Sequence, residues 1–83
     1  MRLNGKTAIV TGAASGFGAG IARRFAAEGA RVMVADINAA AAQTVADEIG
    51  GISQPVDVAD DASVGAMIAA GIAAWGRIDI LVN

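Results

Sequence analysis

A glycine-rich turn at residues 11–18, Thr-Gly-Ala-Ala-Ser-Gly-Phe-Gly, constrains the fold of this 83-residue chain more than any other feature. The preceding residues 6–10 form a short, apolar, β-branched run that is typical of a strand. Beyond the turn, Phe17, Ile21 and Phe25 recur at helical spacing, so the period of the sequence changes across the turn. The pattern predicts a strand, a tight turn and a helix at residues 16–28, with an apolar side chain of adequate volume required at position 17.

A helix that begins at such a turn favours a bound anion, because its free N–H groups and its positive dipole end point beyond the strand. A Cβ at Gly12, Gly16 or Gly18 would obstruct the backbone conformation, the approach of a pyrophosphate, or the contact of helix on strand. A plain strand-to-helix connection is the alternative interpretation. The strand, the helix and an acidic residue further along the chain together favour a phosphate site.

The rest of the chain alternates between predicted strands and helices. They are a strand at residues 31–36, a helix at 39–49, a strand at 52–56, a helix at 60–75 and a strand at 78–82. Asn38 and Asp60 are suitable N-caps, and Pro55 suits an edge strand because it cannot donate a ladder hydrogen bond. The apolar side chains of the third helix are Val64, Met67, Ile68, Ile72 and Trp75.

Strands that alternate with helices in this way predict an α/β fold with a parallel sheet of Rossmann type, in the order βαβαβαβ. Right-handed crossovers place the strands in the order 3-2-1-4. We expect the whole chain, residues 1–83, to be one nucleotide-binding half of such a domain, ending after the fourth strand. About two helices are needed to cover each face of a four-stranded sheet, and the third helix covers one face alone.

Three polar positions follow the predicted strands at the edge of the sheet where such folds bind ligands. Asp36 lies 18 residues past Gly18, where a carboxylate accepts both ribose hydroxyls of an adenosine. Asp57 could accept from an adenine amino group while the backbone beside it, at Val58, reads the ring. Asn83 ends the fourth strand. The alternatives are an acid that caps a helix at Asp36, a turn-forming residue at Asp57 and an ordinary polar strand end at Asn83.

Together these residues resemble the short-chain dehydrogenase/reductase family over the whole chain. The segment Thr11-Gly12-x-x-x-Gly16-x-Gly18 is similar to the cofactor motif of that family, Asp36 to its NAD-selecting acid and Asp57 to its adenine-contacting acid. Residues 77–83 resemble the run that leads into its Asn-Asn-Ala-Gly motif. The resemblance implies NAD as cofactor. The predicted cofactor-binding residues are Thr11, Gly12, Ser15, Gly16, Phe17, Gly18, Asp36, Ile37, Asp57, Val58 and Asn83.

The resemblance also implies that catalysis depends on a Ser-Tyr-Lys set with a further asparagine, which lies later in the family's sequences. This chain has no tyrosine, and its one lysine is Lys6, so we expect no catalytic residue within it. Two hypotheses follow. The chain is part of an NAD-dependent oxidoreductase acting on alcohols or ketones, or it is a truncated half-domain that binds adenine dinucleotide without turnover. A methyltransferase or flavin domain is a more remote alternative, because both usually have a different glycine spacing.

Composition excludes several other classes of function. With no cysteine and no histidine, the chain offers no disulfide, thiolate or imidazole chemistry, and we expect no metal site. The net charge is −2 and the six basic residues are scattered, which argues against nucleic acid as a partner. No apolar run reaches the roughly 20 residues of a membrane span, and no secretory signal is evident, so a cytoplasmic location is the default expectation.

An apolar chain with an unpaired fourth strand is prone to associate with other copies of itself. Apolar residues make up 55% of the sequence. We therefore expect a homo-oligomer that uses the fourth strand and the less covered face of the sheet.

Overall fold

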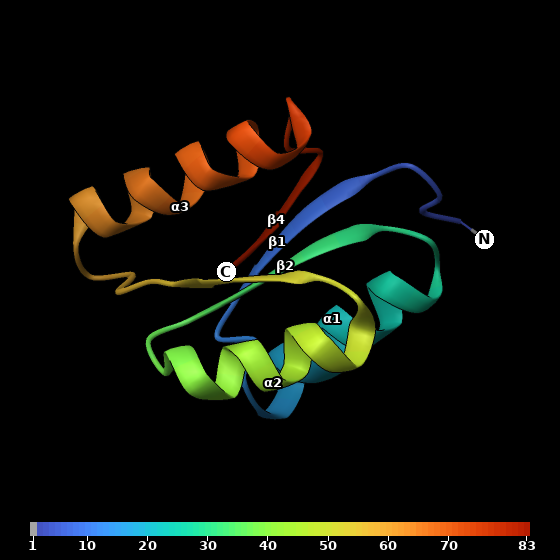
Figure 1. Ribbon diagram of the computed structural model, residues 1–83, viewed down its shortest axis with the longest axis horizontal. Coiled ribbons are helices and arrows are strands. Elements are labelled where there is room, and N and C mark those ends of the chain that lie inside the picture. Colours follow the sequence, from blue (N-terminus) through green and yellow to red (C-terminus); the bar gives the residue numbers. More distant parts are fainter. Residues whose placement is uncertain (1) are drawn as a thin grey trace.

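The computed structural model describes residues 2–83 as a parallel sheet with helices on both faces (Figure 1). The strands are β1 (Thr7–Thr11), β2 (Arg31–Asp36), β3 (Ile52–Pro55) and β4 (Ile80–Val82), and the helices are α1 (Gly16–Ala27), α2 (Ala39–Ile49) and α3 (Asp61–Trp75). The predicted fold class and element order are confirmed. Both predicted caps are present, since Asn38 accepts from the Ala41 N–H at 3.0 Å and Asp60 from the Ala62 N–H at 3.1 Å.

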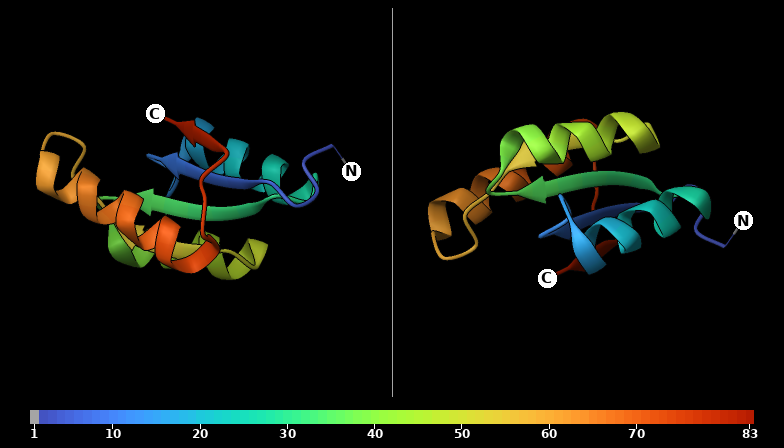
Figure 2. Two further views of the ribbon diagram at one scale, coloured as in Figure 1. Left: turned by 90° about the horizontal axis from the view of Figure 1, so that it is seen from above. Right: turned by 90° about the horizontal axis from the view of Figure 1, so that it is seen from below.

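The strand order is β3-β2-β1-β4, as the crossover rule predicts, and every neighbouring pair is parallel. The arrows of β4, β1 and β2 point the same way in Figure 2, with β4 at the open edge. Val10 on β1 lies opposite both Val34 and Val82. The carboxyl ends of the strands therefore meet at one edge of the sheet, where the polar positions predicted from the sequence follow them.

Alternate residues of the two central strands bury their side chains on opposite faces. On one face, Val10, Val32 and Val34 pack with small residues of α1 and α2. On the other face, Ile9 and Met33 pack with Met67 of α3. Figure 1 shows the same division, with α1 and α2 below the sheet and α3 above it. The expected uneven coverage, two helices on one face and one on the other, is confirmed.

The packing of α1 differs from the prediction. Its buried residues are Ala19 and Ala22, whereas the Phe17 side chain is 95% exposed. The expectation that position 17 needs a side chain of a certain volume is therefore wrong. The reason is the close approach of α1 to the sheet: Ala19 and Ala22 are buried against it and Ile21 and Phe25 are partly buried against the same core, whereas Phe17, in the first turn of the helix, does not reach that core.

The apolar side chains of α3 are buried to different extents. Met67 is buried, but Ile72 is 46% exposed. The second buried position is Gly71, where a Cβ would lie 3.2 Å from the Cδ1 atoms of Ile9 and Ile78. A glycine at this point allows α3 to lie against the sheet.

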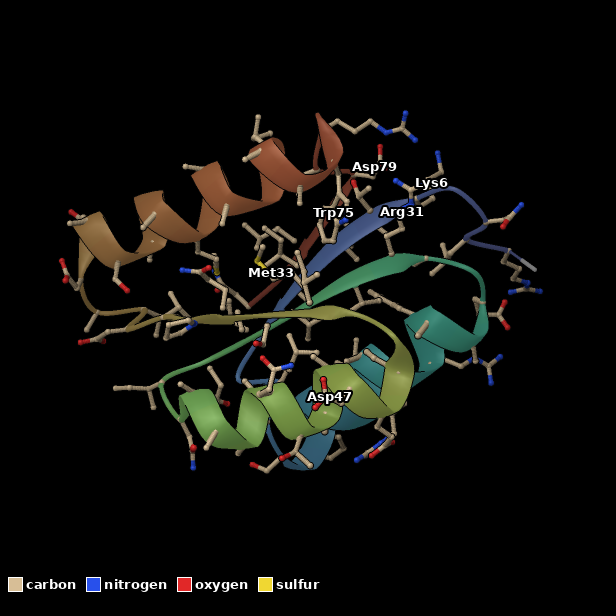
Figure 3. The ribbon with its side chains drawn as sticks, viewed as in Figure 1. Lys6, Arg31, Met33, Asp47, Trp75 and Asp79 are labelled. Atoms are coloured by element: carbon tan, nitrogen blue, oxygen red, sulfur yellow. The ribbon has the colours of Figure 1, made fainter. Side chains whose placement is uncertain are left out.

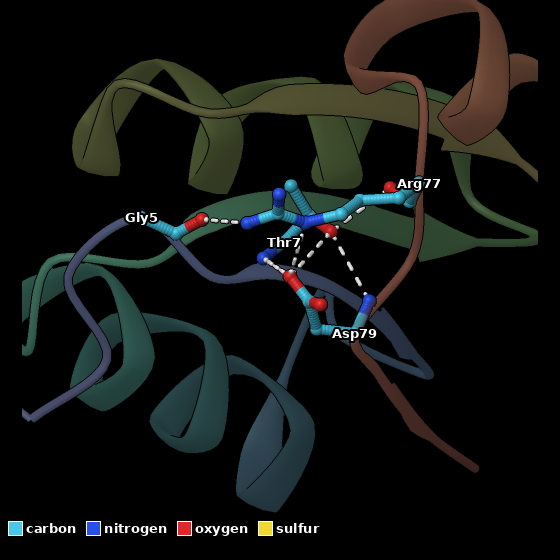
Figure 4. Close-up of polar contacts among 4 residues, drawn as sticks. All are labelled: Gly5, Thr7, Arg77 and Asp79. Carbon is cyan, nitrogen blue, oxygen red and sulfur yellow. Dashed lines mark hydrogen bonds and ion pairs between the residues drawn. The ribbon is translucent and has the colours of Figure 1, made fainter.

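A polar cluster joins β1 to the residues just before β4 at the amino edge of the sheet (Figure 4). The carboxylate of Asp79 accepts from the Thr7 backbone N–H at 2.8 Å and from Nε of Arg77 at 3.1 Å. Arg77 also donates to the Gly5 carbonyl at 2.9 Å. The Thr7 N–H, followed by the Arg77 guanidinium, lowers the pKa of Asp79 below its usual range, which indicates that this cluster holds the ionised carboxylate.

Candidate functional site

The glycine-rich turn after β1 has the geometry of a phosphate cradle. Gly12 and Gly16 adopt φ of 65° and 59°, a backbone region that other residues rarely enter. A Cβ built on either of them meets nothing within 4 Å, so both face open space. A Cβ on Gly18 would instead lie 2.1 Å from the Gly12 carbonyl oxygen, which makes glycine essential for the contact of α1 with the turn. The backbone conformation and the close contact agree with two of the roles that the sequence predicted for these glycines, and the approach of a pyrophosphate stays a prediction.

The N-terminus of α1 has no side-chain cap and can accept an anion. Ser15 is the N-cap, but its side chain makes no capping hydrogen bond, and the first turn contains no acidic residue. The N–H groups of this turn and the positive end of the helix dipole are therefore available to a phosphate or pyrophosphate. Because Gly12 and Gly16 also present open space, the residues fit a dinucleotide phosphate group.

Asp36, the last residue of β2, is hydrogen-bonded to the glycine-rich turn. One carboxylate oxygen accepts from the Ala14 N–H at 3.1 Å, and the other accepts from the Asn38 N–H at 2.9 Å. Asp36 thus organises the start of α2, as the alternative interpretation held, and it also fixes the glycine-rich turn. Carboxylate oxygens each accept more than one hydrogen bond, so these two contacts leave capacity for hydroxyl groups of a ligand.

A cavity of about 180 Å³ lies at the carboxyl edge of the sheet, between the ends of β1, β2 and β3. Five predicted site residues line it together with Val56: Gly12, Asp36, Ile37, Asp57 and Val58. Ile37 and Val58 are 74% and 61% exposed, an unusual state for β-branched apolar side chains. The cavity therefore combines apolar walls with two carboxylates, which suits a flat ring that carries hydrogen-bonding groups.

Asp57 has a local structural role as well. Its Oδ1 accepts from the Ala59 N–H at 3.0 Å, which forms a turn, and its own N–H donates to the Ser63 hydroxyl at 2.9 Å. The turn-forming interpretation of Asp57 therefore holds for the protein itself. It is compatible with a place beside a ligand, because Asp57 also lines the cavity.

Asn83 lies next to the glycine-rich turn. The Thr11 hydroxyl is 3.1 Å from both the Val82 carbonyl oxygen and Oδ1 of Asn83. This contact links the ends of β1 and β4, where the strand order reverses. Thr11 and Asn83 are therefore neighbours, and their part in binding a cofactor stays a prediction.

Phe17 is the predicted site residue whose side chain lies elsewhere. Together with Ile21 and Phe25 it lines a separate apolar hollow along α1. Only the backbone of Phe17, in the first turn of α1, belongs to the cradle. Sequence reasoning also missed Val56, which is 4% exposed and forms part of the cavity wall. The signal for Val56 was its position as an apolar residue between the end of β3 and Asp57.

The part of the chain that the structure describes has neither a metal-binding group of acidic residues nor a membrane-spanning helix. Residues 2–83 contain no group of three or more acidic side chains arranged to hold a metal ion. No helix in the same range is long and apolar enough to cross a membrane.

The fold and the turn together define a nucleotide-binding α/β protein of Rossmann type. A family model described as short chain dehydrogenase matches residues 6–83, and the chain belongs to that family. Members of the family bind nicotinamide cofactors, and this chain corresponds to the nucleotide-binding N-terminal part.

Known proteins of the family resemble the chain closely. A sorbitol dehydrogenase of Cereibacter sphaeroides is 49% identical over 85 residues, which cover 100% of this chain and 33% of that protein. A galactitol 2-dehydrogenase of Agrobacterium fabrum is 52% identical, with the same coverage. A crystal structure of 3-ketoacyl-(acyl-carrier-protein) reductase from Brucella melitensis, complexed with NADH, superposes with a TM-score of 0.92 at 43% identity, covering 95% of this chain and 33% of that one.

The chain therefore spans about a third of the length of the curated relatives that it matches. The comparisons lend no support to the alternative hypothesis of a half-domain that binds a dinucleotide without taking part in catalysis.

Proposed function

We propose that this chain is the NAD-binding part of an oxidoreductase that transfers hydride between a nicotinamide cofactor and an alcohol or ketone. The observation that carries the proposal is the cavity that joins Gly12, Asp36 and Asp57 at the carboxyl edge of the sheet, beside the positive end of α1. The reaction itself relies on residues outside this chain, because the sequence has no tyrosine, histidine or cysteine to donate a proton near neutral pH.

Each part of the site has a distinct role in the proposal. The turn from Gly12 to Gly18 and the N-cap Ser15 hold the pyrophosphate. Asp36 accepts the ribose hydroxyls, while Ile37 and Val58 enclose the adenine ring and Asp57 accepts from its amino group. Support comes from the two exposed apolar side chains, which line the cavity and would gain an apolar partner from a ring bound there. Thr11 and Asn83 lie on the side of β4, towards the rest of the cofactor.

Preference for NADH over NADPH follows from Asp36. The 2′-phosphate of NADPH would face this carboxylate. Two unit charges about 4 Å apart repel by roughly 1 kcal/mol in water and by roughly 4 kcal/mol at an effective dielectric constant of about 20. That energy corresponds to roughly fivefold to nearly a thousandfold weaker binding. Titration of the protein with both reduced cofactors in the same buffer measures the ratio of the two dissociation constants.

The variant Asp36→Asn should reduce the ratio of the dissociation constant of NADPH to that of NADH. Asp47→Asn, which removes an acid from α2, should leave this ratio unchanged. The ratio is the decisive quantity because a general distortion of the turn would weaken the binding of both cofactors to the same extent. Equal or tighter binding of NADPH by the unaltered protein would contradict the role of Asp36. Failure of both cofactors to bind would contradict the proposed site as a whole.

We also propose that the protein is cytoplasmic and that the 83-residue chain, when isolated, self-associates through β4 and the less covered face of the sheet. Leu81 of β4 is 48% exposed and Ile72 of α3 is 46% exposed, which supports an apolar contact on this side. Sedimentation equilibrium at micromolar concentration should give a mass above that of one chain. A monomer that unfolds cooperatively would disprove the self-association.

A further inference from the structure

A second cavity lies at the opposite edge of the sheet from the proposed nucleotide site. Its volume is about 450 Å³, and it is formed where β2 and β3 begin and where α2 and α3 end. Arg31, Ile52 and Trp75 contribute the large side chains of its lining, and Gly50 and Gly51 contribute backbone. The volume falls within the range of about 300–1,000 Å³ that small-molecule sites usually have.

Trp75 gives this amino-edge cavity an aromatic wall. The indole packs partly on the core cluster that contains Met33, and it lines the cavity as well. Figure 3 shows Trp75 extending from the end of α3 towards the sheet, on the same side as Arg31. Ile52, which is 38% exposed, adds an apolar surface. A flat apolar ring would find contacts on both side chains.

Arg31 supplies a positive charge without a protein partner. Within residues 2–83, Arg23, Arg24 and Arg77 each form an ion pair, but Arg31 forms none. The adjacent Lys6, whose carbonyl accepts the Arg31 N–H at 2.8 Å, also has no ion pair in this range. This end of the sheet thus carries two unpaired cations although the net charge of the chain is −2. A guanidinium fork is well suited to a carboxylate.

The ends of two helices restrict which anion can bind. The last residues of α2 and α3 lie at this cavity, and the carbonyl groups of a helix C-terminus carry partial negative charge. These carbonyls disfavour a multiply charged anion more than a single carboxylate, and a small inorganic anion would also leave the apolar wall without a contact. A ligand with a ring for Trp75 and a single carboxylate for Arg31 matches both features.

We propose that the amino-edge cavity binds a small aromatic carboxylate, with its ring against Trp75 and Ile52 and its carboxylate paired with Arg31. This site is separate from the nucleotide site, because the two occupy opposite ends of the same strands. Binding here therefore does not depend on the proposed function.

Phenylacetate is a suitable probe, with its neutral amide and acetate as matched controls that remove the charge and the ring in turn. Trp75 is the only tryptophan, so its fluorescence reports directly on the cavity, and calorimetry measures the same binding independently. Phenylacetate should bind saturably, and both controls should bind at least about fivefold more weakly. Saturating NADH should not compete.

The variant Arg31→Gln should weaken the binding of phenylacetate roughly tenfold, which is the loss expected for one charge-assisted hydrogen-bonded pair. Arg24→Gln, which changes an equally basic residue on α1, should have no effect, and circular dichroism verifies that both variants are folded. The proposal is wrong if phenylacetate gives neither a fluorescence change nor heat. It is also wrong if the neutral amide binds as tightly as phenylacetate, or if Arg31→Gln binds phenylacetate as tightly as the unaltered protein. Competition by NADH would assign the probe to the nucleotide site instead.

Discussion

Replacing Gly18 with alanine should disrupt the glycine-rich turn and abolish dinucleotide binding. The added Cβ would lie 2.1 Å from the carbonyl oxygen and 2.7 Å from the carbonyl carbon of Gly12. Both are backbone atoms, so the clash can be relieved only by moving α1 away from the turn. Overpacking of this kind costs about 3 kcal/mol or more, a large part of the total stability of a small domain. Urea unfolding followed by circular dichroism, and titration with NADH, measure the two effects.

Gly20 provides a matched control in the same helix. A Cβ at Gly20 meets nothing within 4 Å, so Gly20→Ala should preserve NADH binding and stabilise α1 by up to about 1 kcal/mol. Phe17→Leu should also leave binding unchanged, because the Phe17 side chain is 95% exposed. If Gly18→Ala bound NADH as tightly as the unaltered protein, the phosphate cradle would have to lie elsewhere.

The case of α1 shows what a sequence pattern can and cannot determine. The helix was predictable because apolar residues recur at helical spacing between two strands. Which residues are most deeply buried was not predictable, because the apolar face of α1 is wide: Ala19 and Ala22 are buried, Ile21 and Phe25 are partly buried against the same core, and Phe17 is exposed. Hydrophobicity alone would rank the two aromatic side chains first. The close contact at Gly18 brings the beginning of α1 so near the turn that small side chains occupy the centre of the contact, and that distance is visible only in three dimensions.

The candidate site was predictable to the extent that it depends on strand ends. Parallel strands bring their carboxyl ends to one edge, so Asp36 and Asp57 had to be near the glycine-rich turn. Their hydrogen bonds to the protein could not be predicted. The contact of Asp36 with the Ala14 N–H depends on the path of the turn, and no spacing rule specifies it. Each acid thus holds its own loop in place as well as facing the cavity.

Replacing Asp79 with alanine should weaken the attachment of β4 more than any other single removal of a charge. The carboxylate accepts from the Thr7 backbone N–H, the Thr7 hydroxyl and the Arg77 guanidinium. Without it, the Thr7 N–H loses its acceptor in a residue that is only 3% exposed, which is costly. Because Asn83 directly follows β4, its contact with Thr11 should be lost along with the strand. A fall in thermal midpoint and in NADH affinity is therefore expected.

The loss of stability should depend on pH with a definite sign. The pKa of Asp79 in the folded protein is lowered, first by the Thr7 N–H and then by Arg77, so its carboxylate stabilises the fold fully above the ordinary aspartate pKa. This contribution disappears as the pH falls through the lowered pKa of the folded state. The difference in stability between the unaltered protein and Asp79→Asn should thus be constant near neutral pH and shrink under acidic conditions.

Glu48 is the control for this pH dependence, because its pKa is also lowered, by the side chain of Arg23. Both partners of that ion pair are about half exposed, at 48% and 49%, so water and salt screen their attraction. Glu48→Gln should therefore change the thermal midpoint little at any pH, and added salt should remove what difference there is. The effect of Asp79→Asn should persist in salt, since its main hydrogen bond is to the backbone of a buried residue. Equal effects of the two substitutions would show that the cluster at β4 acts as an ordinary surface ion pair.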